Sequence, residues 1–130
     1  MKDGFISIFD KETYEVFDTA VQGFHDSLLR EATLLSRGYV DRDGLMHGDT
    51  DPYDMKLVFH VQSSLSLYVE LFFEEVDVFR FEYGYCIEPS IEFLGDCVQL
   101  YLTDQISTEN CMISAKSMYY RIGTSDHLGN

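Results

Sequence analysis

Residues 63–73 of this chain read SSLSLYVELFF, and from Leu65 to Phe73 apolar side chains fall on every second position. Side chains on an extended strand point alternately to its two faces, so this spacing is typical of a β-strand with one buried face. We expect that face to pack in the core; it holds Leu65, Leu67, Val69, Leu71 and Phe73. Residues 55–62 alternate in the same way, and the short link between the two segments predicts a β-hairpin.

Other parts of the chain show the same pattern over shorter lengths. Glycine, proline and aspartate residues with turn-forming character separate these segments. Further strands are predicted at residues 27–36, 76–85, 97–103 and 111–122. Residues 76–85 place a row of aromatic side chains on one face, which we interpret as core with tyrosine hydroxyls at its rim: Phe79, Phe81, Tyr83 and Tyr85.

Residues 12–22 follow a different period. Tyr14, Phe17 and Val21 recur at spacings of three and four, which predicts a helix that ends at Gly23. Short strands joined by short links form antiparallel sheets, and one helix can cover part of a face. We therefore expect an α+β fold with one N-terminal helix and an antiparallel sheet of about six strands, curved or sandwich-like. No repeat or linker divides the 130 residues, which predicts a single globular domain spanning residues 1–130.

The balance of charged residues restricts the class of partner. Nine Lys and Arg residues stand against 23 Asp and Glu residues, for a formal net charge of −14 at pH 7. Proteins that bind nucleic acid or anionic lipid need a basic surface, so we expect neither a nucleic acid nor a membrane as partner. An acidic surface favours basic protein partners, and it also serves solubility on its own.

The cysteines and the first residues bear on the cellular compartment. Cys86, Cys97 and Cys111 are an odd number without close pairing, so we expect neither a disulfide framework nor a zinc knuckle. Asp3 and Asp10 interrupt any signal-peptide pattern, and the apolar runs are too short to span a membrane. The expected location is the cytoplasm.

Residues 23–30, GFHDSLLR, place His25, Asp26 and Ser27 side by side, which are the three residue types of a hydrolytic triad. A working triad requires the three side chains to converge, whereas consecutive side chains of an extended segment point to opposite faces. The sequence also lacks the glycines of a G-x-S-x-G elbow around Ser27. We predict a structural corner instead, in which Phe24 is buried and His25 and Asp26 bind neighbouring backbone groups.

Residues 41–54, DRDGLMHGDTDPYD, hold five aspartates together with His47. A calcium-binding EF-hand loop that began at Asp41 would need glycine at its sixth position and glutamate at its twelfth. Met46 and Pro52 occupy those positions, so we expect a solvated acidic loop and no metal site. Glu74, Glu75 and Asp77 form a second acidic cluster, which we place at a turn.

These two clusters supply the predicted partner-binding surface. Its candidate residues are Asp41, Asp43, Asp49, Asp51, Glu74, Glu75 and Asp77. With 23 acidic residues, close carboxylates are expected by chance, and a cysteine in a strand pattern is usually a small buried side chain. We therefore predict no catalytic residues and no cofactor.

A helix, then Phe24-His25-Asp26-Ser27, then a leucine-rich strand that ends in ELFFEEVDVF follow one another along the chain. This order resembles small bacterial immunity proteins, which accompany polymorphic toxins. The family pattern has an aromatic-His-Asp-Ser segment and later a Leu-rich strand that ends in Phe, a turn, Val and Phe. The matching positions are Phe24, His25, Asp26, Ser27, Leu71, Phe73, Val76 and Phe79. The resemblance covers residues 14–83 and departs at Glu75, where a turn glycine is expected.

The resemblance implies an acidic protein that neutralises a basic toxin by binding it, without enzymatic activity. The alternative is a small-ligand-binding or self-associating structural module, which the 15% content of aromatic residues also favours. A hydrolase is disfavoured because no convergent set of catalytic residues is visible.

Overall fold

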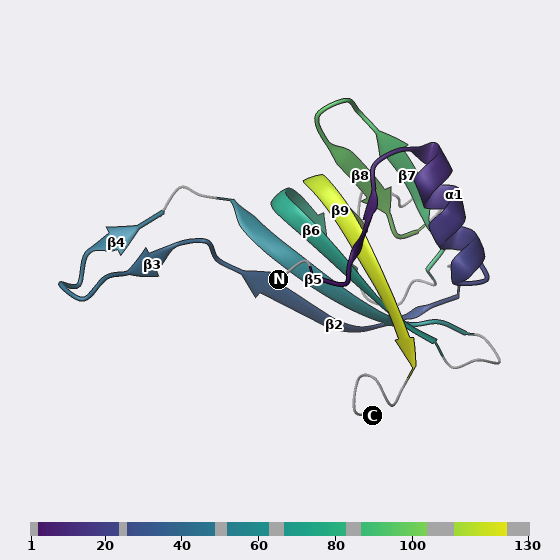
Figure 1. Cartoon of the computed structure of the whole chain (residues 1–130), viewed down its shortest axis with the longest axis horizontal. Coiled ribbons are helices and arrows are strands. Elements are labelled where there is room, and N and C mark those ends of the chain that lie inside the picture. The colour runs from purple at the N-terminus through teal and green to yellow at the C-terminus, as the bar shows by residue number, and fades with distance from the viewer. Residues whose placement is uncertain are drawn as a thin grey trace.

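The computed structural model describes residues 3–23, 26–48, 52–62, 67–82, 87–103 and 111–124 (Figure 1). Within these ranges the chain forms one helix and nine strands. They are β1 (Ile6–Ile8), α1 (Lys11–Ala20), β2 (Leu28–Leu35), β3 (Tyr39–Val40), β4 (Met46–His47), β5 (Tyr53–His60), β6 (Leu67–Arg80), β7 (Ser90–Phe93), β8 (Val98–Tyr101) and β9 (Met112–Thr124).

Seven of the strands form one antiparallel sheet in the order β2-β5-β6-β9-β8-β7, with β1 paired to β9 beside this path. The remaining two, β3 and β4, pair with each other in a separate two-stranded sheet. An antiparallel sheet with one helix is what the sequence predicts. The expected number of about six strands is wrong: β1 and β7 join the sheet through segments too short to show an alternating pattern, while two of the predicted strands form one.

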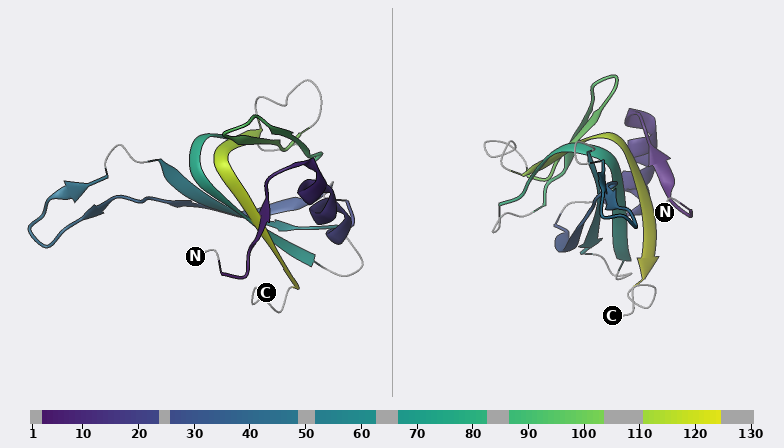
Figure 2. Two further views of the ribbon diagram at one scale, coloured as in Figure 1. Left: turned by 45° about the horizontal axis from the view of Figure 1, so that its top comes forward. Right: turned by 90° about the vertical axis from the view of Figure 1, so that its left-hand side faces the viewer.

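The segments predicted as separate strands at residues 63–73 and 76–85 are joined without a break in one long strand, β6. It runs from Leu67 to Arg80 and pairs with β9 along this length. The predicted turn at Glu74, Glu75 and Asp77 is therefore wrong. The pairing with β9 shifts between Val76 and Val78, and Glu75 has a positive φ of 53°. Such bulges bend a strand without ending it, and Figure 2 shows β6 and β9 curving together.

The predicted inward face of β6 is confirmed for its described members, and Leu65 lies outside the described residues. Val69, Leu71 and Phe73 are fully buried, and Leu67 is half-buried against the same cluster. The matching side chains of β5 join this core, as predicted: Met55, Leu57 and Phe59, together with Val61 just beyond the strand. These residues form the core beneath the helix.

Helix α1 covers this face of the sheet (Figure 1). Phe17 and Val21 are fully buried, and the Phe17 ring lies 4.8 Å from the ring of Tyr120 on β9. The helix ends before Gly23, as predicted, and the Gly23 N–H donates to the Asp18 carbonyl at 2.8 Å. Among the described residues no helix has the length and apolar character needed to cross a membrane.

The opposite face of β6 is also buried, although its alternating sequence predicts a solvated face. Tyr68, Glu70 and Phe72 are each less than 5% exposed. The Phe5 ring lies 5.9 Å from Phe72, and the His60 ring stacks on Tyr68 at 4.2 Å. Side chains from distant parts of the chain therefore cover the face that the local pattern leaves open.

A buried carboxylate is stable only when it is paired, and Glu70 has two cationic partners. Arg121 Nε donates to Glu70 Oε2 at 2.6 Å, and Lys56 Nζ lies 3.7 Å from Glu70 Oε1. The Arg121 guanidinium in turn lies 4.5 Å from the centre of the Phe5 ring. This cluster joins β5, β6, β9 and the N-terminal segment on the second face of the sheet.

Candidate functional site

A hairpin projects from the sheet between β2 and β5 (Figures 1 and 2). We call residues 36–48 the arm; it contains β3 and β4, which pair through Tyr39 with His47 and Val40 with Met46. In both figures the arm extends well beyond the other strands. The sequence prediction of a solvated loop at its tip missed this hairpin, because two-residue strands carry no detectable alternation.

Asp41 builds the turn at the tip of the arm. Its Oδ1 accepts the backbone N–H groups of Asp43 and Leu45, each at 2.9 Å, and its Oδ2 lies 2.7 Å from His47 Nε2. Gly44 has a φ of 82°, which suits glycine at this position of the turn. The hydrogen bond from His47, followed by that from Leu45, lowers the pKa of the Asp41 carboxyl group. Asp41 therefore serves the hairpin itself.

Large apolar side chains on the arm are open to solvent. Among the described residues twelve large apolar side chains are exposed, and four of them belong to the arm: Tyr39, Val40, Leu45 and Met46. Met46 is the most exposed of the twelve, at 69%. Leu34 and Tyr53 adjoin the arm and are exposed as well. A concentration of exposed apolar side chains on one element is typical of an interaction surface.

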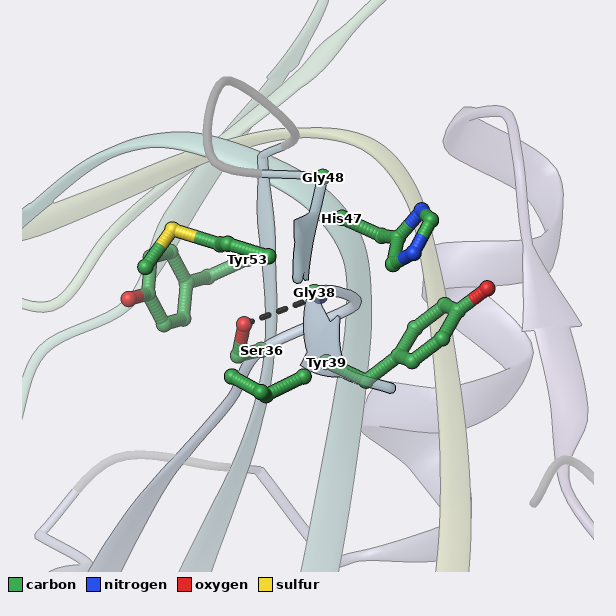
Figure 3. A pocket seen from close by; sticks show the side chains of 8 residues that line it. Ser36, Gly38, Tyr39, His47, Gly48 and Tyr53 are labelled. Carbon is green, nitrogen blue, oxygen red and sulfur yellow. Dashed lines mark hydrogen bonds between the residues drawn. The ribbon is translucent and has the colours of Figure 1, made fainter. Parts of the chain in front are cut away.

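An open hollow of about 320 Å³ lies along the arm (Figure 3). Its lining residues are Ser36, Gly38, Tyr39, Val40, Met46, His47, Gly48 and Tyr53. Figure 3 shows Tyr39 and His47 on one side of the hairpin and Tyr53 on the other, and the Tyr39 and His47 rings stack at 4.7 Å. A Cβ on Gly38 would lie 2.8 Å from the His47 carbonyl oxygen, so the close approach of the two chains requires glycine there.

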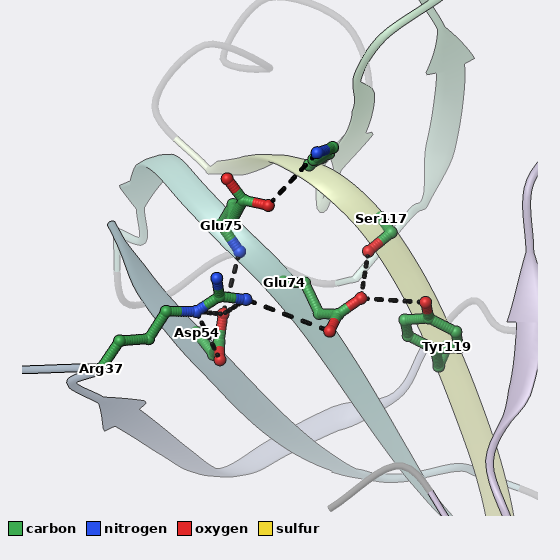
Figure 4. Close-up of polar contacts among 7 residues, drawn as sticks. Arg37, Asp54, Glu74, Glu75, Ser117 and Tyr119 are labelled. Carbon is green, nitrogen blue, oxygen red and sulfur yellow. Dashed lines mark hydrogen bonds and ion pairs between the residues drawn. The ribbon is translucent and has the colours of Figure 1, made fainter. Parts of the chain in front are cut away.

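The arm is fixed at its base by Arg37 and Asp54 (Figure 4). Arg37 Nε lies 3.1 and 3.2 Å from the two carboxylate oxygens of Asp54, and Arg37 Nη2 lies 3.1 Å from Oδ1. The hydrogen bond to Asp54 raises the pKa of Arg37. Asp54 Oδ1 also accepts the backbone N–H of Glu75 at 3.0 Å, which ties this base to the bulge of β6.

Glu74 extends the same network to β9. Its Oε1 accepts the hydroxyls of Ser117 at 2.8 Å and Tyr119 at 2.9 Å, and its Oε2 lies 4.0 Å from Arg37 Nη2 (Figure 4). Glu75 pairs with Lys116 at 3.5 Å. The predicted acidic cluster on β6 is thus held near the base of the arm, and two of its three members are engaged within the protein.

The remaining predicted site residues are dispersed. Asp43 is exposed at the tip of the arm, and Asp77 is exposed on β6. Asp49 and Asp51 lie outside the described residues. Sequence reasoning missed Arg37 and its contact with Asp54, because the two residues are 17 positions apart and share no local pattern.

Two of the four residues from Phe24 to Ser27 can be placed. Phe24 and His25 lie outside the described residues, so the structural corner stays a prediction. Asp26 is exposed, has a φ of 56°, and donates its N–H to the Ile87 carbonyl at 2.8 Å. Ser27 is 7% exposed. The Asp26 side chain is therefore solvated while that of its neighbour is buried.

The structure also bears on metal and thiol chemistry. Within the described ranges no three His, Cys, Asp or Glu side chains lie close enough together to hold a metal ion. Cys111 is buried, as predicted for a strand cysteine, and its sulfur accepts the Glu82 N–H at 3.2 Å. Cys97 is half-buried, and Cys86 lies outside the described residues.

Comparison of the chain with protein-family models, with curated proteins and with solved structures finds no match. The arm, its exposed apolar side chains and its ionic base are therefore the features from which a function has to be inferred.

Proposed function

We propose that this protein acts by binding another protein, and that the arm is the element that docks. The observation that carries the proposal is the exposure of Tyr39, Val40, Leu45 and Met46 on a hairpin that projects from the sheet. A two-stranded hairpin gains little stability in water on its own. Covering these apolar side chains with a partner would stabilise both the contact and the arm.

The geometry of the arm supports this role. Asp41 organises its tip, Gly38 allows the two chains to approach closely, and Arg37 and Asp54 fix its base. A binding element held in its bound shape loses less conformational entropy on association than a flexible loop does. These contacts make the arm a preorganised docking element.

The charge of the chain favours a basic partner. The net charge is −14, and residues 41–54 hold five aspartates against one arginine. Interfaces commonly combine an apolar centre with a charged rim, and complementary charge speeds association and excludes unsuitable partners. A basic toxin, as the resemblance to immunity proteins implies, would have this chemistry.

A first experiment identifies the protein that contacts the arm. Met46 is replaced by the photo-crosslinking residue benzoylphenylalanine, and the crosslinked product is identified by mass spectrometry. The matched control carries the same residue in place of Val16, which is 60% exposed but lies on helix α1. We expect a basic protein that crosslinks from position 46 and not from position 16.

A second experiment measures the contact with the purified partner. Replacing Tyr39 and Met46 together by serine should weaken binding by about tenfold or more, because central apolar residues dominate interface energies. Val16→Ser should leave the affinity unchanged. Unchanged affinity in the arm variant would overturn the proposed role of the arm.

Salt dependence tests the electrostatic part of the proposal. Attraction between exposed charges is screened over about 10 Å at 0.1 M salt. The association rate should therefore fall as salt rises, with a smaller change in the dissociation rate. Asp43→Asn should lower the association rate in low salt and reduce its salt dependence. An association rate that is indifferent to salt would mean that the acidity serves solubility alone.

A further inference from the structure

Strand β2 forms one edge of the seven-stranded sheet, and none of its eight side chains is buried. Exposed edge strands of natural proteins are usually short or interrupted by proline, since unpaired backbone groups attract other strands. β7 at the other end of the sheet order fits that rule, because it has four residues and directly follows Pro89. β2 is twice as long and contains no proline.

The direction of the backbone groups on β2 follows from the register of the sheet. The Val61 N–H donates to the Leu67 carbonyl at 2.9 Å, so Val61 turns its backbone groups toward the β6 side. In antiparallel sheets successive residues of a strand bond alternately to the neighbour on either side. Counting back along β5, Lys56 turns its backbone groups toward β2, where its register partner is Thr33.

Thr33 therefore bonds to β5, and the residues on either side of it do not. The N–H and C=O groups of Ala32 and Leu34 point away from β5, toward the open side of the sheet. Figure 1 shows no other strand beyond β2 on this side, and β2 ends the sheet order in the described part of the chain. These two residues offer backbone donors and acceptors at the spacing that an added strand requires.

We infer that the β2 edge receives an extended segment of the partner protein, which adds to the sheet as a further strand. This inference rests on the proposed function and names how the partner is held. Backbone hydrogen bonds to Ala32 and Leu34 supply the pairing, and neighbouring side chains select the sequence that pairs. Because β2 leads directly into the arm, the added strand and the arm contact form one continuous surface.

The side chains of β2 define the chemistry of that segment. Leu34 is paired with Met55 and Ala32 with Leu57, so both lie on the helix-covered side of the sheet, where an apolar partner side chain would fit. Glu31 is exposed and points to the other side, where it favours a basic residue. The expected segment therefore alternates apolar and basic residues.

A second copy of this chain is the other occupant that such an edge admits. Each copy carries a net charge of −14, so the approach of two copies is opposed by repulsion, while a basic segment is attracted. Arg30 is the one basic residue of β2, and its Nη1 already donates to the Tyr68 hydroxyl at 3.0 Å. The charge distribution favours a basic segment of a different protein.

Amide hydrogen exchange on the unaltered protein tests this inference residue by residue. In the free protein the N–H groups of Ala32 and Leu34 should exchange rapidly, and that of Thr33 should exchange slowly because it is bonded to β5. Binding of the purified basic partner should slow the exchange of Ala32 and Leu34 by about tenfold or more, since hydrogen-bonded amides exchange only on opening.

A pair of variants provides an independent measurement. Ala32→Pro removes the outward N–H and leaves the bonds of Thr33 to β5 intact, and it should weaken partner binding by about tenfold. Ala32→Val keeps the N–H and should change binding by less than about twofold, because valine suits a strand. Thermal melts report whether both variants fold; if Ala32→Pro does not, the exchange experiment decides.

The outcomes separate the two proposals. If the partner binds but Ala32 and Leu34 stay unprotected, or if a folded Ala32→Pro variant binds normally, the edge inference is wrong and the arm proposal stands. If the two amides are already protected in the free protein, increasingly so at higher concentration, a second copy occupies the edge and the inference is wrong. If no basic partner binds at all, the proposed function fails as well.

Discussion

Strands β6 and β2 lie in the same sheet, separated only by β5, yet their surroundings differ in every respect. Six consecutive side chains of β6, from Tyr68 to Phe73, are less than 5% exposed, whereas no side chain of β2 is buried. β6 has α1 over one face and Phe5 against the other, and neighbours on both edges. Burial is therefore decided by what lies over a strand rather than by its own pattern. The exposed strand is the one that remains available to a partner.

The largest expected effect compares the same substitution on the two strands. Leu71 is fully buried on β6, so Leu71→Ala should lower the free energy of unfolding by about 2–5 kcal/mol. Leu34 is 58% exposed on β2, so Leu34→Ala should stay within about 0.5 kcal/mol. Urea-induced unfolding measures both. A cost above about 2 kcal/mol for Leu34→Ala would mean that β2 is covered in solution.

A second comparison contrasts a buried and an exposed carboxylate. Glu70→Gln on β6 should cost about 1–3 kcal/mol, because it leaves Arg121 and Lys56 beside a neutral side chain in a buried site. Glu31→Gln on β2 should stay within about 0.5 kcal/mol. The same unfolding measurements apply. Equal effects of the two substitutions would show that the cluster around Glu70 is as well hydrated as the sheet edge.

The sequence predicts one face of β6 well and the other face poorly. A period of two fixes which residues share a face, so Val69, Leu71 and Phe73 were placed correctly. It says nothing about what covers the opposite face, where His60 and the distant Phe5 bury Tyr68 and Phe72. Long-range packing of this kind leaves no local signal.

The acidic residues of β6 do not end the strand, although their types predict that they would. Glu74, Glu75 and Asp77 are poor strand formers, and the sequence predicts a turn there. In the structure Glu74 accepts two hydroxyls from β9 and Glu75 pairs with Lys116, and these cross-strand contacts keep the segment in the strand. Tertiary contacts here override local propensity.

In the candidate site, too, features encoded by neighbouring residues could be predicted, and contacts between residues far apart in the sequence could not. The aspartates of residues 41–54 marked this region from the sequence, and Asp41 and Gly44 do form a turn there. The exposure of the arm's apolar side chains could not be predicted. Residues such as Tyr39 and Met46 are usually buried, so their types alone indicate core rather than surface. The contact between Arg37 and Asp54 could not be predicted either, because only the folded sheet brings these two residues together.

A smaller effect is expected at the bulge of β6. Glu75 adopts a φ of 53°, a conformation that favours glycine, and a glycine is what the family resemblance leads one to expect there. Glu75→Gly relieves that strain but loses the ion pair with Lys116, so the protein should become more stable by about 0–1 kcal/mol. Lys116→Met removes the same ion pair but keeps the positive φ at Glu75. The difference between the two variants in the free energy of unfolding therefore measures the cost of that backbone strain. A clear loss of stability in Glu75→Gly alone would contradict this account.

The smallest effect should be confined to the arm and should leave β6 unchanged. In the folded arm the hydrogen bonds from His47 and Leu45 lower the pKa of Asp41, while in a disordered arm the carboxyl group would titrate near its ordinary value of about 4. Because the folded pKa is the lower one, Asp41 stabilises the hairpin above about pH 4, and this contribution is lost as the pH falls through the folded value. NMR spectra should therefore show the Tyr39 ring signals, set by stacking on His47, moving toward disordered values only as the pH falls below about 4, while the Leu71 signals stay fixed. Asp41→Asn should remove this dependence. An unchanged transition in that variant would assign the pH effect to another group and leave the tip of the arm without its proposed anchor.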